Sequence, residues 1–186
     1  MTNIAVFISG TGTNLRTIAQ WCQKNPTLAR VSVVIANKSN IEGLNIAREF
    51  GIPSVVILTK GVSMEEFENE ATKHLFDINL ICLAGFMRVL TPQFTCKWAG
   101  KMINIHPSLL PAFKGADAIT DAIAYGVKIT GCTVHFVTSE IDSGRIIVQK
   151  PVAICIGETK ESLKIKIQKA EINAYTEALN DLILVK

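Results

Sequence analysis

Short apolar runs that alternate with helix-like segments constrain the fold of this chain more than any other feature of its sequence. The runs lie at residues 4–9, 31–36, 52–58 and 79–84. The segments after the first three runs predict helices that end near Lys24, Gly51 and Phe76, with capping boxes at Ser39–Glu42 and Ser63–Glu66 starting the second and third. This alternation predicts a parallel sheet buried between two layers of helices, with right-handed crossovers.

The rest of the chain predicts an antiparallel addition to that sheet. A strand at 102–105 is followed by a helix at 117–125, and a polar turn then joins strands at 130–137 and 145–156. Thr159 is expected to cap a last helix with one buried apolar stripe. We therefore expect an α/β fold of the Rossmann-like, three-layer α/β/α type, with a mostly parallel central sheet and a C-terminal antiparallel addition.

Composition limits the class of protein and its partners. With 186 residues and 48% hydrophobic content, one domain over residues 1–186 is expected. A net charge of +3 suits small anionic ligands and does not indicate nucleic acid binding. The five cysteines form no CxxC motif or Cys/His cluster, so we expect buried thiols in a reducing cytoplasm and no metal. No signal sequence or membrane-length apolar run is recognised. The sequence is compatible with a homodimer and does not decide between a monomer and a dimer.

The stretch NIHPSLLP at 104–111 is the first candidate site. Pro107 restricts the residue before it to extended geometry, so the strand should end at His106. Asn104 and His106 lie two residues apart and should project from one face of the strand end, where open α/β sheets bind ligands. Imidazole can move a proton and a carboxamide can donate to an oxyanion. The alternative is a buried histidine beside a turn asparagine.

The polar turn SEIDSG at 139–144 offers a carboxylate partner for that histidine. Asp142 could reach back to His106, fix its tautomer and stabilise the imidazolium. An aspartate that only hydrogen-bonds its own turn is the competing interpretation. Glu140 is the nearest rival carboxylate.

The glycine-rich loop GTGTN at 10–14 lies between the first strand and the first helix. A helix N-terminus offers free N–H groups to an anion, and glycine lets the backbone approach it. The spacing matches neither G-x-G-x-x-G nor a Walker loop, which disfavours a dinucleotide or ATP. A tight turn without a ligand remains open on sequence alone.

Four motifs in order resemble the formyltransferase family that uses 10-formyltetrahydrofolate. NIHPSLLP at 104–111 and DSG at 142–144 carry the resemblance. ISGTGTNL at 8–15 and LAGFMRVL at 83–90 narrow it to the branch that formylates phosphoribosylglycinamide in purine synthesis. The resemblance spans residues 4 to about 175. It implies the two small-molecule substrates, no metal, a nucleotide-side half of about 1–90 and a folate-side half of about 91–186.

The resemblance also implies residue roles. His106 would be the general acid and base, Asn104 the oxyanion donor that also faces the folate, and Asp142 the partner of His106. The phosphate would bind at Gly12, Thr13 and Asn14 and the ribose hydroxyls at Glu171, while the pteridine pocket would be lined by Met87, Arg88, Val89 and Leu90.

Two positions depart from the family pattern. Asp117 and Ile119 occupy the places of a His-x-His pair, and Met64 occupies that of an arginine that helps to hold the folate. These changes bear on affinity for the folate tail and on ribonucleotide binding. The lysines of the last helix are expected to form a solvated face and no binding patch: Lys160, Lys164, Lys166 and Lys169.

Three other readings compete. Methionyl-tRNA formyltransferase would need a further domain and a broad basic surface for tRNA, and this sequence is only weakly basic. Formyltetrahydrofolate deformylase would need an extra N-terminal domain, which we do not expect before the strand at Ile4. A regulatory module on a decayed scaffold is supported only by the missing histidine pair.

Overall fold

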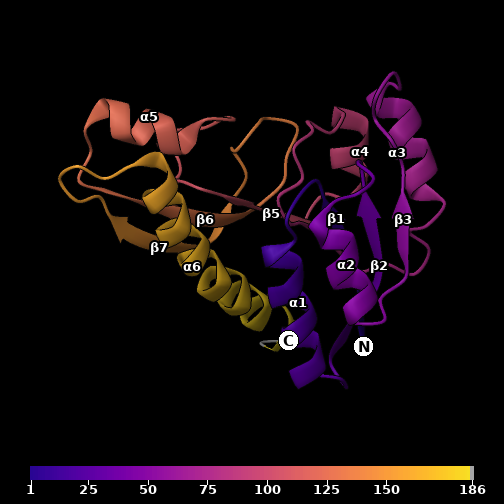
Figure 1. The fold of residues 1–186 in the computed structure, drawn as a ribbon. Coiled ribbons are helices and arrows are strands. Elements are labelled where there is room, and N and C mark those ends of the chain that lie inside the picture. Colours follow the sequence, from indigo (N-terminus) through magenta and orange to yellow (C-terminus); the bar gives the residue numbers. More distant parts are fainter. Residues whose placement is uncertain (185–186) are drawn as a thin grey trace.

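A single seven-stranded sheet runs through the molecule (Figure 1). The computed structural model describes residues 1–184. The strands, in spatial order, are β3 (Ser54–Val56), β2 (Ala29–Ala36), β1 (Thr2–Ile8), β4 (Leu80–Leu83), β5 (Met102–His106), β6 (Ile129–Phe136) and β7 (Ile146–Ala153). The helices are α1 (Thr13–Lys24), α2 (Glu42–Glu49), α3 (Met64–Thr72), α4 (Pro92–Lys97), α5 (Ala118–Tyr125) and α6 (Lys160–Leu179), which continues into a π-helical segment, Asn180–Leu184.

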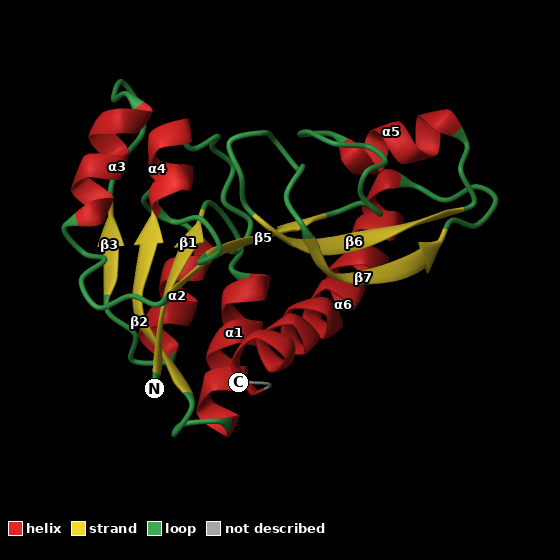
Figure 2. Cartoon of the chain, turned by 180° about the vertical axis from the view of Figure 1, so that it is seen from behind, coloured by secondary structure: helices red, strands yellow, loops and turns green. Residues whose placement is uncertain are grey.

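Two apolar cores lie on opposite faces of this sheet. Along β1, Ile4, Val6 and Ile8 belong to one core, and Ala5 and Phe7 belong to the other. This alternation follows from the two-residue period of a strand. Helices α1, α2 and α6 cover the first core, and α3 and α4 cover the second (Figures 1 and 2). Because both faces are covered, β1, β2 and β4 read as nearly continuous apolar runs.

The direction of pairing changes at β5. Strands β1 to β5 pair in parallel, whereas β5 with β6 and β6 with β7 pair antiparallel. The predicted fold class is therefore confirmed, including the antiparallel addition. Since β4 and β5 run side by side, the chain leaves both at the same edge of the sheet, where the loops after β1, β4 and β5 meet.

Several local predictions were wrong. Helix α2 begins at Glu42 after an extended Ile41, without a side-chain cap, so Ser39 caps nothing. Its start is set instead by packing, because the Gly43 N–H donates to the Gly10 carbonyl at 3.0 Å. The third strand spans only Ser54–Val56, and α3 ends at Thr72, short of the exposed Phe76. The cap at Ser63 and the cap at Thr159 are confirmed.

The cysteines divide into two groups. Cys22, Cys82 and Cys132 are buried as expected, but Cys96 and Cys155 are exposed. Cys96 lies on the outer side of α4, whose inner side carries the buried Phe94. Within residues 1–184, no helix combines the length and apolarity that crossing a membrane requires.

Candidate active site

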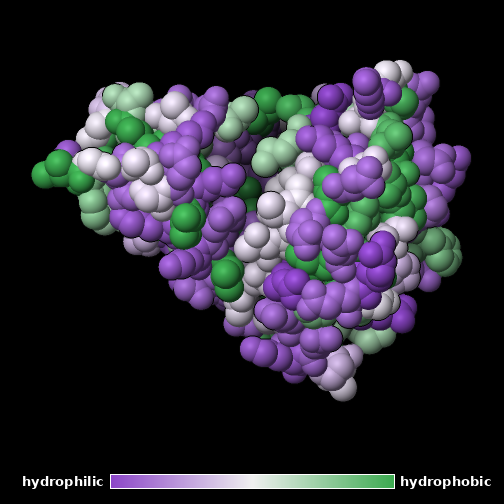
Figure 3. All heavy atoms as spheres, in the orientation of Figure 1, coloured by the Kyte–Doolittle hydropathy of each residue, from purple (hydrophilic) through white to green (hydrophobic). Residues whose placement is uncertain are grey.

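Two adjoining pockets open at the ends of β1, β4 and β5. The α6 pocket, of about 380 Å³, lies between the Gly10–Asn14 loop, α6 and the start of α5. The β5 pocket, of about 390 Å³, lies between the 83–90 segment, the end of β5 and the 138–142 turn. The two pockets share lining residues: Gly85, Met87, Ile105, Pro107 and Ala116. Figure 3 shows the surface hollowed between the α5–α6 side and the body of the molecule.

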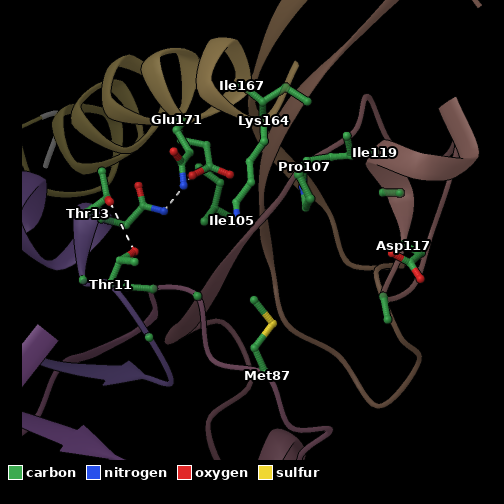
Figure 4. A pocket seen from close by; sticks show the side chains of 18 of the residues that line it. Thr11, Thr13, Met87, Ile105, Pro107, Asp117, Ile119, Lys164, Ile167 and Glu171 are labelled. Atoms are coloured by element: carbon green, nitrogen blue, oxygen red, sulfur yellow. Dashed lines mark hydrogen bonds between the residues drawn. The ribbon is translucent and has the colours of Figure 1, made fainter. Parts of the chain in front are cut away.

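The α6 pocket contains all four residues predicted to bind the ribonucleotide. Gly12, Thr13, Asn14 and Glu171 line it together. Asn14 Nδ2 donates to Glu171 Oε2 at 2.9 Å, which joins the start of α1 to the middle of α6 (Figure 4). Helix α1 has no side-chain cap and no acidic residue in its first turn, so none of its own side chains occupies the N-terminal N–H groups beside the pocket.

Position 12 requires glycine for two reasons, its backbone conformation and the close approach of Gly43. It has a φ of 77°, in the left-handed region that favours glycine. A Cβ on Gly12 would lie 2.6 Å from the Cα of Gly43. The close approach of the two glycines holds the loop against the start of α2.

Glu171 is a largely buried carboxylate at the bottom of the α6 pocket. Burial raises its pKa above the usual value, opposed by the hydrogen bond from Asn14 and by the charge of Lys164. Asn14 is only 7% exposed, and its Oδ1 has no hydrogen-bond partner within residues 1–184. This wall of the pocket therefore holds a carboxylate and an amide oxygen that lacks a donor among the described residues.

The β5 pocket contains the residues predicted to bind the folate. Met87, Arg88, Val89 and Leu90 line it with Asn104. Met87 is 74% exposed and Val89 63%, whereas Leu90 is buried. The Met87 N–H donates to Ser9 Oγ at 2.8 Å, which fixes the segment against the end of β1. The result is an apolar wall beside the polar end of β5.

His106 and Asp142 are in contact, as predicted. His106 Nδ1 lies 3.3 Å from Asp142 Oδ2, and both side chains are nearly buried. His106 Nε2 lies 2.7 Å from the Phe113 carbonyl oxygen. With an acceptor at each ring nitrogen, both interactions are hydrogen bonds only when the ring carries both N–H groups.

Asp142 is held ionised by several donors. Partial burial alone would raise its pKa, but hydrogen bonds from His135 and the Gly115 N–H, with the charges of His106 and His135, outweigh burial and hold the pKa below its usual value. The Gly115 N–H donates to Asp142 Oδ2 at 2.9 Å. Gly144 is needed beside it, because a Cβ there would lie 1.7 Å from the Phe136 carbonyl oxygen. Glu140, the rival carboxylate, is exposed.

Sequence reasoning missed His135. Its Nε2 lies 3.6 Å from Asp142 Oδ1 and 3.4 Å from Asn104 Nδ2, and its Nδ1 lies 2.9 Å from the Phe136 carbonyl oxygen. Asp142 thus stands between two histidines, and one of them also contacts Asn104. The available signal was a histidine inside the apolar run of β6.

The NIHPSLLP stretch is supported by polar residues that sequence reasoning also missed. Thr133 Oγ1 donates to the Ser108 carbonyl at 2.7 Å and accepts from the Leu110 N–H at 3.0 Å. Gln149 Nε2 donates to the Leu110 carbonyl at 2.8 Å. The register of β6 and β7 puts Thr133 opposite Gln149, so the antiparallel addition holds the loop that follows His106.

The departures from the family pattern lie at the rims of the two pockets. Asp117 and Ile119 line the α6 pocket, and Asp117 Oδ1 lies 3.2 Å from Lys160 Nζ. Met64 does not itself line the β5 pocket, but its Sδ accepts at 3.4 Å from Nε of Arg88, which does.

The lysines of α6 are mostly solvated, as expected, because Lys160, Lys164 and Lys169 are exposed and Lys166 is half-buried in its pair with Glu158. Lys160 and Lys164 also line the α6 pocket, whereas Lys169 lies outside both pockets. Residues 160 and 164 lie four apart and residues 164 and 171 lie seven apart, so all three recur on one side of the helix next to its buried stripe.

The arrangement suits an acyl transfer between two ligands. A group bound in one pocket can reach a group bound in the other at their shared wall, which is beside the carboxamide of Asn104 and the imidazole of His106. A carboxamide donor, an ionisable imidazole and an ionised carboxylate are the groups that such a reaction uses. Within residues 1–184, no three His, Cys, Asp or Glu side chains gather as a metal site.

Comparison with known proteins gives the family. Residues 2–179 match the formyl transferase family. The trifunctional purine biosynthetic protein adenosine-3 of Gallus gallus is 48% identical over 179 residues, which are 95% of this chain and 18% of that protein. The phosphoribosylglycinamide formyltransferase of Haemophilus influenzae is 40% identical over 94% of this chain and 84% of its own length.

A solved structure has the same fold. The glycinamide ribonucleotide transformylase 1 of Symbiobacterium toebii superposes with a TM-score of 0.92 at 39% identity, over 96% of this chain and 86% of that one. This chain therefore spans less than a fifth of the trifunctional relative but most of the bacterial ones. On the family match and the fold together, the chain belongs to the formyl transferase family.

Proposed function

We propose that this protein transfers the formyl group of 10-formyltetrahydrofolate to the amine of 5-phosphoribosylglycinamide, a step of purine synthesis. The observation that carries the proposal is the pair of pockets that share a wall at the end of β5, next to Asn104 and His106. Relatives named for this reaction match nearly the whole chain.

In this proposal the α6 pocket binds the ribonucleotide. N–H groups at the start of α1 bind the phosphate, and Gly12, Thr13 and Asn14 form that loop. Glu171 and Asn14 Oδ1 are acceptors, and ribose hydroxyls are donors that suit them. The glycinamide amine then extends to the shared wall.

The β5 pocket binds the formyl donor. The segment Met87–Leu90 supplies a partly exposed apolar wall for a flat pteridine ring, with Arg88 at its edge. The formyl carbon, which is attached to the folate nitrogen, lies at the shared wall beside Asn104.

The chemistry needs an oxyanion donor and a proton shuttle. The amine nitrogen attacks the formyl carbon, a C–N bond forms, and the carbonyl π electrons move to oxygen. Asn104 Nδ2, which lies 3.4 Å from His135 Nε2, carries two N–H groups that can donate to that oxyanion. Collapse breaks the bond from the formyl carbon to the folate nitrogen, and His106 supplies the proton that the leaving nitrogen needs and accepts the one that the amine loses. Asp142 orients the ring and stabilises its cation.

A direct assay tests the proposal. Purified protein is incubated with 10-formyltetrahydrofolate and phosphoribosylglycinamide, and the formylated ribonucleotide is detected by mass spectrometry. The expected result is one formyl group on the ribonucleotide amine for each folate consumed. Parallel reactions without the ribonucleotide measure release of formate. Formate release with no formylated product would contradict the proposal and favour a deformylase.

A further inference from the structure

The α6 pocket is lined by charged side chains as well as by the main-chain N–H groups of the Gly10–Asn14 loop. Four ionisable side chains line it: Asp117, Lys160, Lys164 and Glu171. Lys160 and Asp117 form an ion pair with each other at the outer rim. This leaves Lys164 and Glu171 as the charges that face the interior of the pocket.

Lys164 lies where a ligand can reach it. It is seven residues before Glu171 on α6, so the two side chains share a side of the helix about two turns apart. In Figure 4 the Lys164 side chain extends from α6 into the pocket, toward the side of Ile105 and Glu171. Within residues 1–184 Lys164 forms no hydrogen bond or ion pair, whereas Lys166 on the same helix is paired with Glu158.

The polar groups of the pocket divide by kind. Glu171 and the unpartnered Asn14 Oδ1 are acceptors and lie together. The uncapped start of α1 and the Lys164 ammonium are donors. A ribose 5-phosphate unit carries groups that match both kinds, with hydroxyl donors for the acceptors and a dianionic phosphate for the donors.

Resting on the proposed function, we infer that Lys164 is the side-chain cation that binds the phosphate of the ribonucleotide, opposite the N–H groups at the start of α1. Those N–H groups carry only partial charges, and the nearby Glu171 carboxylate repels a phosphate dianion. An ammonium on a long, flexible stem neutralises that repulsion, and Lys is a common point-charge ligand for phosphate.

The test compares Lys164→Ala with Lys169→Ala. Lys169 is on the same helix with the same charge but lies outside both pockets, so it controls for net charge and helix content. The Lys164→Ala variant should raise the KM for phosphoribosylglycinamide about 10- to 100-fold, the range for a hydrogen bond to a charged group. Its kcat and its KM for the folate should stay within about twofold of the parent. Lys164→Arg should recover most of the loss.

A substrate without phosphate separates phosphate binding from an effect through Glu171. With glycinamide riboside, the Lys164→Ala variant and the parent should have the same KM. An equal loss of affinity with and without the phosphate would overturn the inference, because Lys164 would then act on Glu171. Equal KM values for Lys164→Ala and Lys169→Ala would overturn it as well.

Calorimetry with ribose 5-phosphate measures phosphate binding directly and so tests the inference without relying on catalysis. The parent should bind it more tightly than Lys164→Ala, and added salt should weaken binding to the parent more than binding to the variant. Lys164-dependent binding in a protein that transfers no formyl group would uphold this inference and refute the proposed function. Formyl transfer with no effect of Lys164→Ala on phosphate binding would uphold the proposed function and refute this inference.

Discussion

The two pockets differ in which polar groups line them and in how far those groups are already bonded to one another. The α6 pocket presents main-chain N–H groups at the start of a helix, and its acceptor Asn14 Oδ1 has no partner within residues 1–184. In the β5 pocket the polar side chains are already joined: Asp142 contacts two histidines and the Gly115 N–H, and His135 contacts Asn104. One pocket is organised to receive polar groups and the other to hold its own groups in position.

This difference predicts how each pocket responds to substitution. In the joined network each side chain orients another, so removing one should reduce turnover more than ligand affinity. In the α6 pocket the polar groups are joined only in pairs, Asn14 with Glu171 and Asp117 with Lys160, so a substitution there should mainly change affinity for the ribonucleotide.

The largest effect is expected for His106→Ala. Loss of the proton shuttle should lower kcat about 10²- to 10⁴-fold, while affinity for the ribonucleotide changes little. Steady-state kinetics and calorimetry measure the two quantities. His74→Ala, on a histidine outside both pockets, is the matched control. A normally folded His106→Ala protein with parental kcat would refute the assignment.

A smaller loss is expected for Asp142→Asn, which keeps the shape and removes the charge. Formyl transfer should fall about 10- to 100-fold because His106 loses its orienting carboxylate, with ribonucleotide affinity unchanged. The Glu140→Gln variant should behave like the parent, since Glu140 is exposed. If Glu140→Gln lost activity and Asp142→Asn did not, the partner of His106 would be misassigned.

The same variant makes a prediction about pH. The folded-state pKa of Asp142 is below its usual value of about 3.9, so its ionised form stabilises the fold above that pH. That contribution is lost as the pH falls through the folded-state pKa. Thermal melts should therefore show a Tm difference between the parent and Asp142→Asn at pH 7 that shrinks toward pH 3. A difference independent of pH would contradict this account.

A third substitution separates affinity from stability in the α6 pocket. The pKa of Glu171 is raised, so its protonated form contributes to the stability of the folded state, fully below about pH 4.3. That stability is lost as the pH rises through the folded-state pKa. Glu171→Gln cannot ionise and should have a higher Tm than the parent at pH 8, with little difference at pH 4. Its KM for the ribonucleotide should rise about tenfold, because a neutral amide is a weaker acceptor for the ribose hydroxyls. Lower Tm at pH 8 would show that the carboxylate stabilises the fold.

The smallest effect is expected at the edge of the β5 pocket. Met64→Leu keeps the volume and removes the sulfur that accepts from Arg88 Nε. The KM for the folate should change less than about twofold, since a thioether is a weak acceptor. A tenfold change would mean that Met64 contributes to folate binding as the family arginine is expected to.

The sequence by itself determined the order of strands and helices and the positions of the candidate groups. Strand β1 was recognisable because both of its faces are buried, and His106 was recognisable because a proline after a buried strand marks where the strand ends. The family motifs then indicated which polar residues to compare, and the structure brings them to two adjoining pockets.

Only the tertiary structure decided which of these groups meet. His135 joins Asp142 and Asn104 because β6 pairs antiparallel with β5, where Asn104 lies opposite His135, and no local pattern specifies that register. Helix α2 begins where Gly43 packs against Gly12, not where its capping box predicted. Lys164 and Lys169 have the same local chemistry, and only the rotation of α6 against the sheet turns one of them into a pocket. Propensity and motif act over a few residues, whereas strand register and helix rotation are set by packing between segments that lie far apart in the chain.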